Sequence, residues 1–119
     1  MQLAMLMIVA PDLARAEEFY GGTLGFVLKS RDGRHLVFAH AGADLVIFKG
    51  AGDALPAQHG QTASTNFVFA VPSLDGTIAA LKAEGVEFLH AIPAAGPFGR
   101  YAAFRDPFGN VLELVERAG

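Results

Sequence analysis

The chain contains no cysteine, which excludes disulfide bonds, thiol nucleophiles and zinc or iron–sulfur sites built on cysteine. Charged residues are scarce, at 18% of 119 residues, where globular domains average about a quarter. No window approaches the roughly 18 consecutive apolar residues of a transmembrane helix, so we expect no membrane partner. Residues 1–5 lack the basic region of a signal peptide, and we therefore expect a cytoplasmic protein.

The composition also limits the partners. Nine Lys and Arg against twelve Asp and Glu give a net charge of −3 without a basic cluster, which argues against nucleic acid. Apolar residues make up 52% of the chain, enough to exclude a disordered protein. Because a domain of this size has a limited core, we expect some apolar residues to line a cavity or a subunit interface.

The chain repeats its organisation once, with an offset of 61 residues between Pro11 and Pro72. Each copy begins with a strand-like run and continues with a helix, capped by Asp12 in the first copy and by Ser73 in the second. The predicted helices cover 13–20 and 74–83, and the predicted strands cover 3–9, 26–30, 35–40, 44–48, 67–71, 86–92, 101–105 and 111–116.

Each half is therefore β-α-β-β-β, and the sequence predicts an α+β fold of two tandem βαβββ modules. The first module spans 1–49 and the second 65–119, and a Gly- and Ala-rich linker over 50–64 joins them into one structural domain. The second copy is longer than the first, and the added residues match a loop over 93–99.

This order resembles the vicinal oxygen chelate superfamily, which includes glyoxalase I, extradiol dioxygenases, fosfomycin-resistance enzymes and bleomycin-resistance proteins. The resemblance rests on the closing sequence DPFGNVLELVE over 106–116 and on the opening VAPDL over 9–13, with Phe19-Tyr20 and the LGF of 24–26 behind it. It covers essentially the whole chain. It implies a curved, cup-like mixed sheet whose concave face holds the ligand, with the helices on the convex face.

In enzymatic members of this superfamily, up to four inward-facing residues hold a divalent metal. The resemblance carries these positions onto Met5, Val46, Asn66 and Glu113. A catalytic Mn, Fe, Ni or Zn ion needs about three N or O donors from the protein. Only Glu113 is a strong ligand, since the others offer a thioether, no donor and a weak amide carbonyl. We therefore expect no metal and no other cofactor.

The four histidines do not form an obvious substitute. His35 and His40 lie an odd number of residues apart on one predicted strand, so they point to opposite faces. His59 falls in the linker, and His90 falls near the end of a predicted strand. Each is expected to be solvent-facing or singly hydrogen-bonded, and a ligand role requires several of them to converge in the fold.

Strand alternation predicts a mostly apolar cup, because residues two apart on a strand share a face. Phe98 and Tyr101 lie near its mouth with Arg100 between them, and these side chains could stack on a planar ligand or clamp an anionic one. The predicted ligand-binding residues are Met5, Met7, Val46, Phe48, Asn66, Val68, Phe98, Arg100, Tyr101, Val111 and Glu113. Methionines at such positions more often fill the core than contact a ligand, and Phe98 and Tyr101 could equally pack against the neighbouring module.

Glu113 has two interpretations. A carboxylate in an apolar strand is costly to bury, so a hydrogen bond from Asn66 or Tyr101 could satisfy it, or it could be the remnant of a lost metal site. It could also contact a cationic or hydrogen-bond-donating ligand, or act as a catalytic general base.

These observations favour a metal-free small-molecule-binding protein, similar to drug-sequestering bleomycin-resistance proteins and acting as a homodimer. One alternative is a glyoxalase-like metal-dependent lyase, dioxygenase or epimerase with a metal site elsewhere. Another is a metal-independent acid–base enzyme that uses Glu113. The sequence names no ligand, because members of one fold catalyse unrelated reactions.

Overall fold

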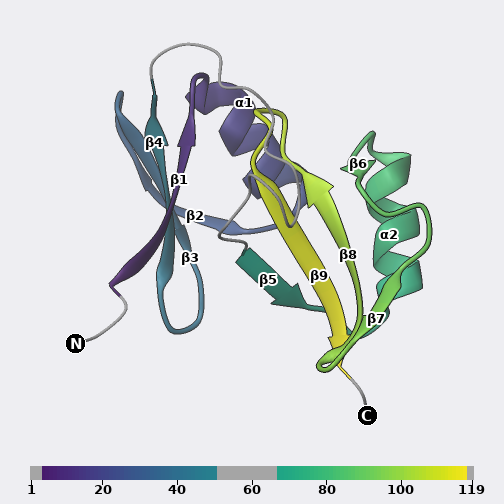
Figure 1. Cartoon of the computed structure of the whole chain (residues 1–119). Helices are drawn as coiled ribbons and strands as arrows, with labels where there is room; N and C mark the ends of the chain where they lie inside the picture. Colours follow the sequence, from purple (N-terminus) through teal and green to yellow (C-terminus); the bar gives the residue numbers. More distant parts are fainter. Residues whose placement is uncertain (1–3, 51–66, 118–119) are drawn as a thin grey trace. The chain divides into compact units, whose positions relative to one another are not determined.

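The computed structural model describes residues 4–50 and 67–117, so the linker predicted over 50–64 lies, apart from Gly50, outside the described residues. The chain forms two compact units, 1–54 and 55–119, and each has its own sheet and helix (Figure 1). Within the described residues, no helix is long and apolar enough to cross a membrane.

The first unit contains a four-stranded sheet with the order β1-β4-β3-β2. The outer strand β1 runs parallel to β4, and the other two pairs are antiparallel. Its elements are β1 (Met5–Ala10), α1 (Leu13–Glu17), the π-helix η1 (Glu18–Thr23), β2 (Val27–Arg31), β3 (His35–Ala39) and β4 (Asp44–Lys49).

The first helix begins where the sequence predicts and ends later than expected. The Asp12 carboxylate accepts a hydrogen bond from the Arg15 backbone N–H at 3.1 Å, which caps α1. After Glu17 the turns widen into η1, whose last backbone bond runs from the Leu24 N–H to the Phe19 carbonyl. Gly21 and Gly22, which follow the predicted end of the helix at residue 20, lie inside this π-helix.

The two faces of the first sheet differ as strand alternation predicts. Phe38, Leu45 and Ile47 are fully buried together with Tyr20 of η1, and they form the core of this unit. On β1, Met5, Met7 and Val9 occupy the opposite face and are about half exposed.

The second unit repeats this plan with a five-stranded sheet. Its central order is β5-β9-β8-β6, with β5 and β9 parallel, and β7 pairs with β8. Its elements are β5 (Phe67–Ala70), α2 (Leu74–Ala83), β6 (Glu87–Phe88), β7 (Ala94–Gly96), β8 (Gly99–Arg105) and β9 (Val111–Arg117). The α+β class with two βαβββ modules is therefore confirmed.

The segment after α2 departs most from prediction. The strand expected over 86–92 shortens to β6, and the expected loop over 93–99 contains β7, which folds back along β8. His90 explains the early end of β6. The Ala103 N–H donates to His90 Nδ1 at 2.9 Å, so a side chain takes the hydrogen bond that a strand backbone would have accepted.

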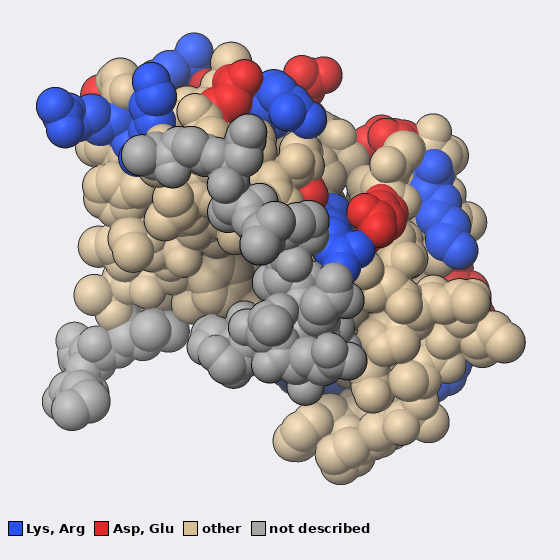
Figure 2. Space-filling view, turned by 45° about the horizontal axis from the view of Figure 1, so that its top comes forward, with Lys and Arg blue, Asp and Glu red and all other residues tan. Residues whose placement is uncertain are grey.

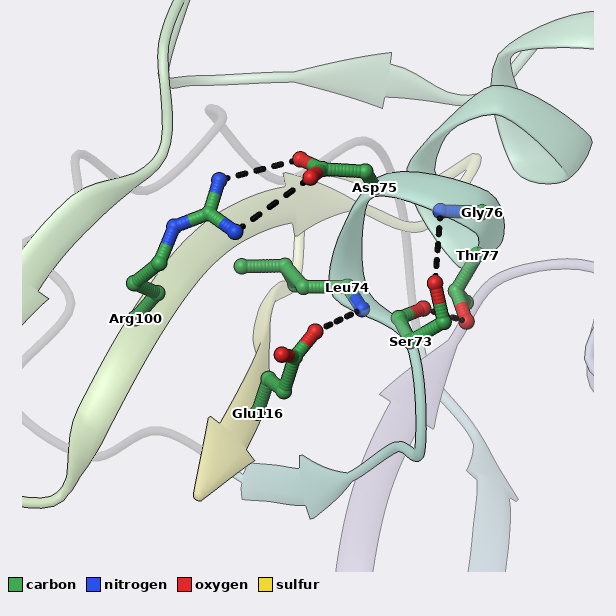
Figure 3. Close-up of polar contacts among 7 residues, drawn as sticks. All are labelled: Ser73, Leu74, Asp75, Gly76, Thr77, Arg100 and Glu116. Atoms are coloured by element: carbon green, nitrogen blue, oxygen red, sulfur yellow. Dashed lines mark hydrogen bonds and ion pairs between the residues drawn. The ribbon is translucent and has the colours of Figure 1, made fainter. Parts of the chain in front are cut away.

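Polar contacts fix the start of α2 (Figure 3). Ser73 Oγ accepts from the Gly76 N–H at 3.2 Å, and a Glu116 carboxylate oxygen of β9 accepts from the Leu74 N–H at 2.6 Å. Arg100 of β8 forms two bonds to the Asp75 carboxylate, at 3.0 and 3.3 Å. Two strands thus hold the first turn of this helix against the sheet.

Candidate functional site

A pocket of about 800 Å³ lies in the second unit, on the face of the sheet that does not carry α2. Its size is within the range usual for small-molecule sites. Its lining is mostly apolar and comes from β5, β8, β9 and the β7–β8 turn: Val68, Ala70, Gly96, Pro97, Phe98, Gly99, Tyr101, Glu113, Val115 and Arg117. The pocket therefore combines an apolar surface with two charged side chains on one strand.

Strand register places the floor of the pocket. Glu113, Val115 and Arg117 alternate along one face of β9, while Val68 and Ala70 pair with Glu113 and Val115 from β5. The distance from the Cα atom of Glu113 to that of Arg117 is about 13 Å, since a strand rises about 3.3 Å per residue. The two charges thus stand at opposite ends of an apolar strip.

An aromatic wall stands over this floor. Tyr101 pairs with Val115 across β8 and β9, and its ring meets the His90 ring edge-on at a centroid distance of 5.6 Å. A Cβ atom added to Gly96 would lie 3.1 Å from Cε1 of Tyr101, so the absence of a side chain there lets this ring pack closely. Phe98, at the β7–β8 turn, is 78% exposed and offers a second aromatic surface.

Four predicted ligand-binding residues meet in this pocket: Val68, Phe98, Tyr101 and Glu113. Two others of the same unit are not part of its lining. Val111 is buried in the sheet, and Arg100 lies on the opposite face, where it pairs with Asp75. Asn66 lies outside the described residues.

Arg117 is a charged residue of the pocket that the sequence prediction did not include. The predicted strand ended at Glu116, one residue too early, although the alternation of Glu113 and Val115 continues to Arg117. Extending the strand by one residue would have found it. Arg117, rather than Arg100, therefore lines the pocket.

The other predicted residues gather on the first sheet. Met7 pairs with Val46, and Met5 and Val9 lie beside them on β1, so these residues share one face with Phe48. Phe48 packs against the His35 ring at a centroid distance of 5.6 Å, and His35 Nδ1 lies 3.0 Å from an Asp32 carboxylate oxygen. This face is mostly apolar, and His35 and Asp44 add polar groups to it.

The donor set does not fit a catalytic divalent metal. Of the positions that the family resemblance assigns to metal ligands, Val46 has no donor atom, Met5 has a thioether, and Glu113 alone has a carboxylate. Among the described residues, no three His, Asp or Glu side chains group closely enough to hold a metal ion.

The charged surface is mixed. On the face shown in Figure 2, Lys and Arg lie interspersed with Asp and Glu, and much of the surface is uncharged. This distribution agrees with the net charge of −3 and differs from the continuous basic field of a nucleic-acid-binding surface.

Comparisons with known proteins extend these observations. The model of the Glyoxalase/Bleomycin resistance protein/Dioxygenase superfamily matches residues 2–114. No curated protein sequence matches the chain.

Several solved structures are similar. A glyoxalase/bleomycin resistance protein from Streptomyces sp. CB03234 is 30% identical, with a TM-score of 0.67 over 95% of this chain and 98% of that one. TnmS3, an antibiotic binding protein from the same organism, is 27% identical, with a TM-score of 0.72 over 99% of both chains. The fosfomycin resistance protein FosX from Listeria monocytogenes shares the fold, at 20% identity and a TM-score of 0.78 over 98% of this chain and 91% of that one.

Proposed function

Because this chain belongs to the Glyoxalase/Bleomycin resistance protein/Dioxygenase superfamily, we propose that it is a small-molecule-binding protein that sequesters its ligand without a metal. The ligand occupies the pocket of the second unit and has a planar apolar body. The observation that carries this proposal is the apolar lining, with two aromatic rings above a strip of small side chains. The likeness to TnmS3, an antibiotic binding protein, supports the same class of function.

The aromatic wall is suited to a planar ligand. Tyr101 meets the His90 ring edge-on and packs closely against Gly96, so its ring is preorganised before a ligand arrives. Phe98 lies exposed on the β7–β8 turn and offers its ring to the ligand. Offset stacking on such rings contributes about 0.5–1.5 kcal/mol beyond the burial of apolar surface.

Binding of the neutral fluorophore N-phenyl-1-naphthylamine tests this site. We expect saturable binding to the wild-type chain, reported by fluorescence without interference because the protein has no tryptophan. Val68→Asp places a charge beside Glu113 on the pocket floor, and should weaken binding at least tenfold. The control is Val27→Asp, at a more exposed valine of the first unit that does not line the pocket, and should leave affinity unchanged. Equal affinity in all three proteins would overturn the proposal.

The metal-free part of the proposal has a separate test. Protein purified without chelator is analysed by mass spectrometry for Mn, Fe, Ni and Zn, and we expect each far below one ion per chain. A near-stoichiometric metal that disappears in Glu113→Ala would contradict the proposal. It would favour the metal-dependent lyase, dioxygenase or epimerase instead.

The homodimer also stays a prediction. Sedimentation equilibrium of the full chain tests it directly, because a dimer has twice the 12.5 kDa of one chain. A mass of one chain at all concentrations would contradict it.

A further inference from the structure

We propose that the ligand of this pocket carries an acidic group, which Arg117 binds at the end of the apolar strip. This inference rests on the proposed function, because it concerns the same pocket. Arg117 lines the pocket from the last position of β9, and its cross-strand partner on β8 is Gly99, which has no side chain. A guanidinium group at this position is open to a ligand and presents up to two parallel N–H donors to an acid.

The other arginines of this unit show why Arg117 is distinctive. Arg100 is neutralised by Asp75, and Arg105 donates to a Glu87 carboxylate oxygen at 2.8 Å. Within the described part of the chain, the Arg117 guanidinium forms no ion pair or hydrogen bond with another side chain. Its charge is thus available to a ligand, whereas the charges of Arg100 and Arg105 are used inside the protein.

Glu113 determines where the acidic group must lie. Its Cα atom lies about 13 Å from that of Arg117 along the same face of β9, at the strand rise of about 3.3 Å per residue, and its carboxylate would repel an anion bound near it. The favourable orientation places the acid beside Arg117 and the apolar body over Val115, against Tyr101. A group that donates hydrogen bonds fits the Glu113 end. The predicted ligand class is therefore an aromatic acid, with any donor group remote from the acid.

Two related fluorophores test this inference. The sulfonate 8-anilinonaphthalene-1-sulfonate has an aromatic body close to that of N-phenyl-1-naphthylamine and adds the negative charge. Arg117→Gln should lower the affinity for the sulfonate about tenfold and change the affinity for the neutral amine by less than twofold. Arg117→Lys should retain part of the sulfonate affinity, because it keeps the charge and loses the planar fork. Added NaCl should weaken sulfonate binding to the wild type more than to Arg117→Gln.

Matched controls separate this effect from general ones. Arg34→Gln removes the same charge from an exposed turn of the first unit, away from the pocket, and should leave both affinities unchanged. In competition experiments, 2-naphthoate and 2-naphthyl phosphate should displace the sulfonate at lower concentrations than neutral 2-naphthamide. The ratio of the dissociation constants of 2-naphthoate and 2-naphthyl phosphate then distinguishes a carboxylate ligand from a phosphate ligand. Circular dichroism of each variant verifies that it is folded.

The outcomes distinguish this inference from the proposed function. If the neutral amine binds in a Val68-dependent manner and Arg117→Gln leaves sulfonate affinity intact, the pocket binds ligands and the acidic-group inference is wrong. If neither fluorophore responds to Val68→Asp, both proposals are overturned.

Discussion

At the scale of single residues, Asp106 shows how one side chain organises a hairpin. It is 5% exposed, and is the one buried charged residue in the part of the chain that the structure describes. One carboxylate oxygen accepts from the Phe108 and Asn110 N–H groups, and the other accepts from the Asn110 side-chain amide. The carboxylate thereby holds the turn that brings β8 and β9 into register, and β9 carries the charged floor of the pocket.

Asp106→Ala should lower the free energy of unfolding by about 2–4 kcal/mol, because it leaves two backbone N–H groups without their acceptor. Asp106→Asn keeps one acceptor oxygen and should cost about half as much. Urea denaturation followed by circular dichroism measures both values. Equal losses in the two variants would show that the hydrogen bonds to the backbone are not the source of the stability.

Arg100 and Arg117 show what strand alternation can and cannot predict. Alternation correctly placed Glu113 and Val115 on one face, and applied one residue further it identifies Arg117. For Arg100 the sequence pattern offered no comparable face, because it lies between the predicted loop over 93–99 and the predicted strand over 101–105. The structure begins β8 at Gly99, so Arg100 falls on the helix side of the sheet. The predicted strand begins two residues later than β8, and this error decides whether Arg100 is assigned to the pocket or to the side of the sheet that carries the helix.

At the scale of elements, the segment between α2 and β8 was the least predictable. Its strand pattern is interrupted by a side-chain hydrogen bond between residues 13 apart, from the Ala103 N–H to His90. Nothing in the local sequence reveals that partner. The N-terminal caps of both helices, by contrast, depend on residues within three positions, and Asp12 and Ser73 could be identified from the sequence alone.

The pairing of α2 with β8 predicts a specific pH dependence. The hydrogen bond and charge of Arg100 hold the pKa of Asp75 below its ordinary value of 3.8. Because the pKa is lowered in the folded state, the pair contributes fully above pH 3.8, and its contribution is lost as the pH falls through the lower, folded-state value. Both groups are exposed, so the effect is small and weakens with added salt.

Asp75→Asn tests this dependence. Its stability should fall below that of the wild type at pH 6, and the difference should fade as the pH drops below 3.8. Unfolding midpoints measured across this pH range at low salt provide the comparison. Glu84→Gln, at the other end of the same helix, is the control and should show no such fading. A difference that stays constant across the range would contradict the role of the Asp75 charge.

At the scale of the whole molecule, the duplication was the most informative feature of the sequence. The repeat of a strand, a capped helix and further strands predicted both sheets, because each module needs a helix to cover one apolar face. The high apolar content now has a structural account. Part of it forms two cores, and part remains exposed on sheet faces, including Met7 at 54% and Val68 at 51%. On the second of these faces a pocket is built, and the β7–β8 turn supplies Phe98 to its lining.

The two cores predict that the units lose structure separately. Phe38 packs near Tyr20 in the first unit, and Phe104 packs against Phe88 in the second, and both phenylalanines are fully buried. Phe38→Leu should cost about 1–2 kcal/mol and accelerate amide hydrogen exchange in β3 and β4, while β8 and β9 keep their protection. Phe104→Leu should have the reciprocal effect. If either substitution accelerates exchange equally in both sheets, the chain unfolds as one cooperative unit, and a ligand bound in the second unit would then protect the first as well.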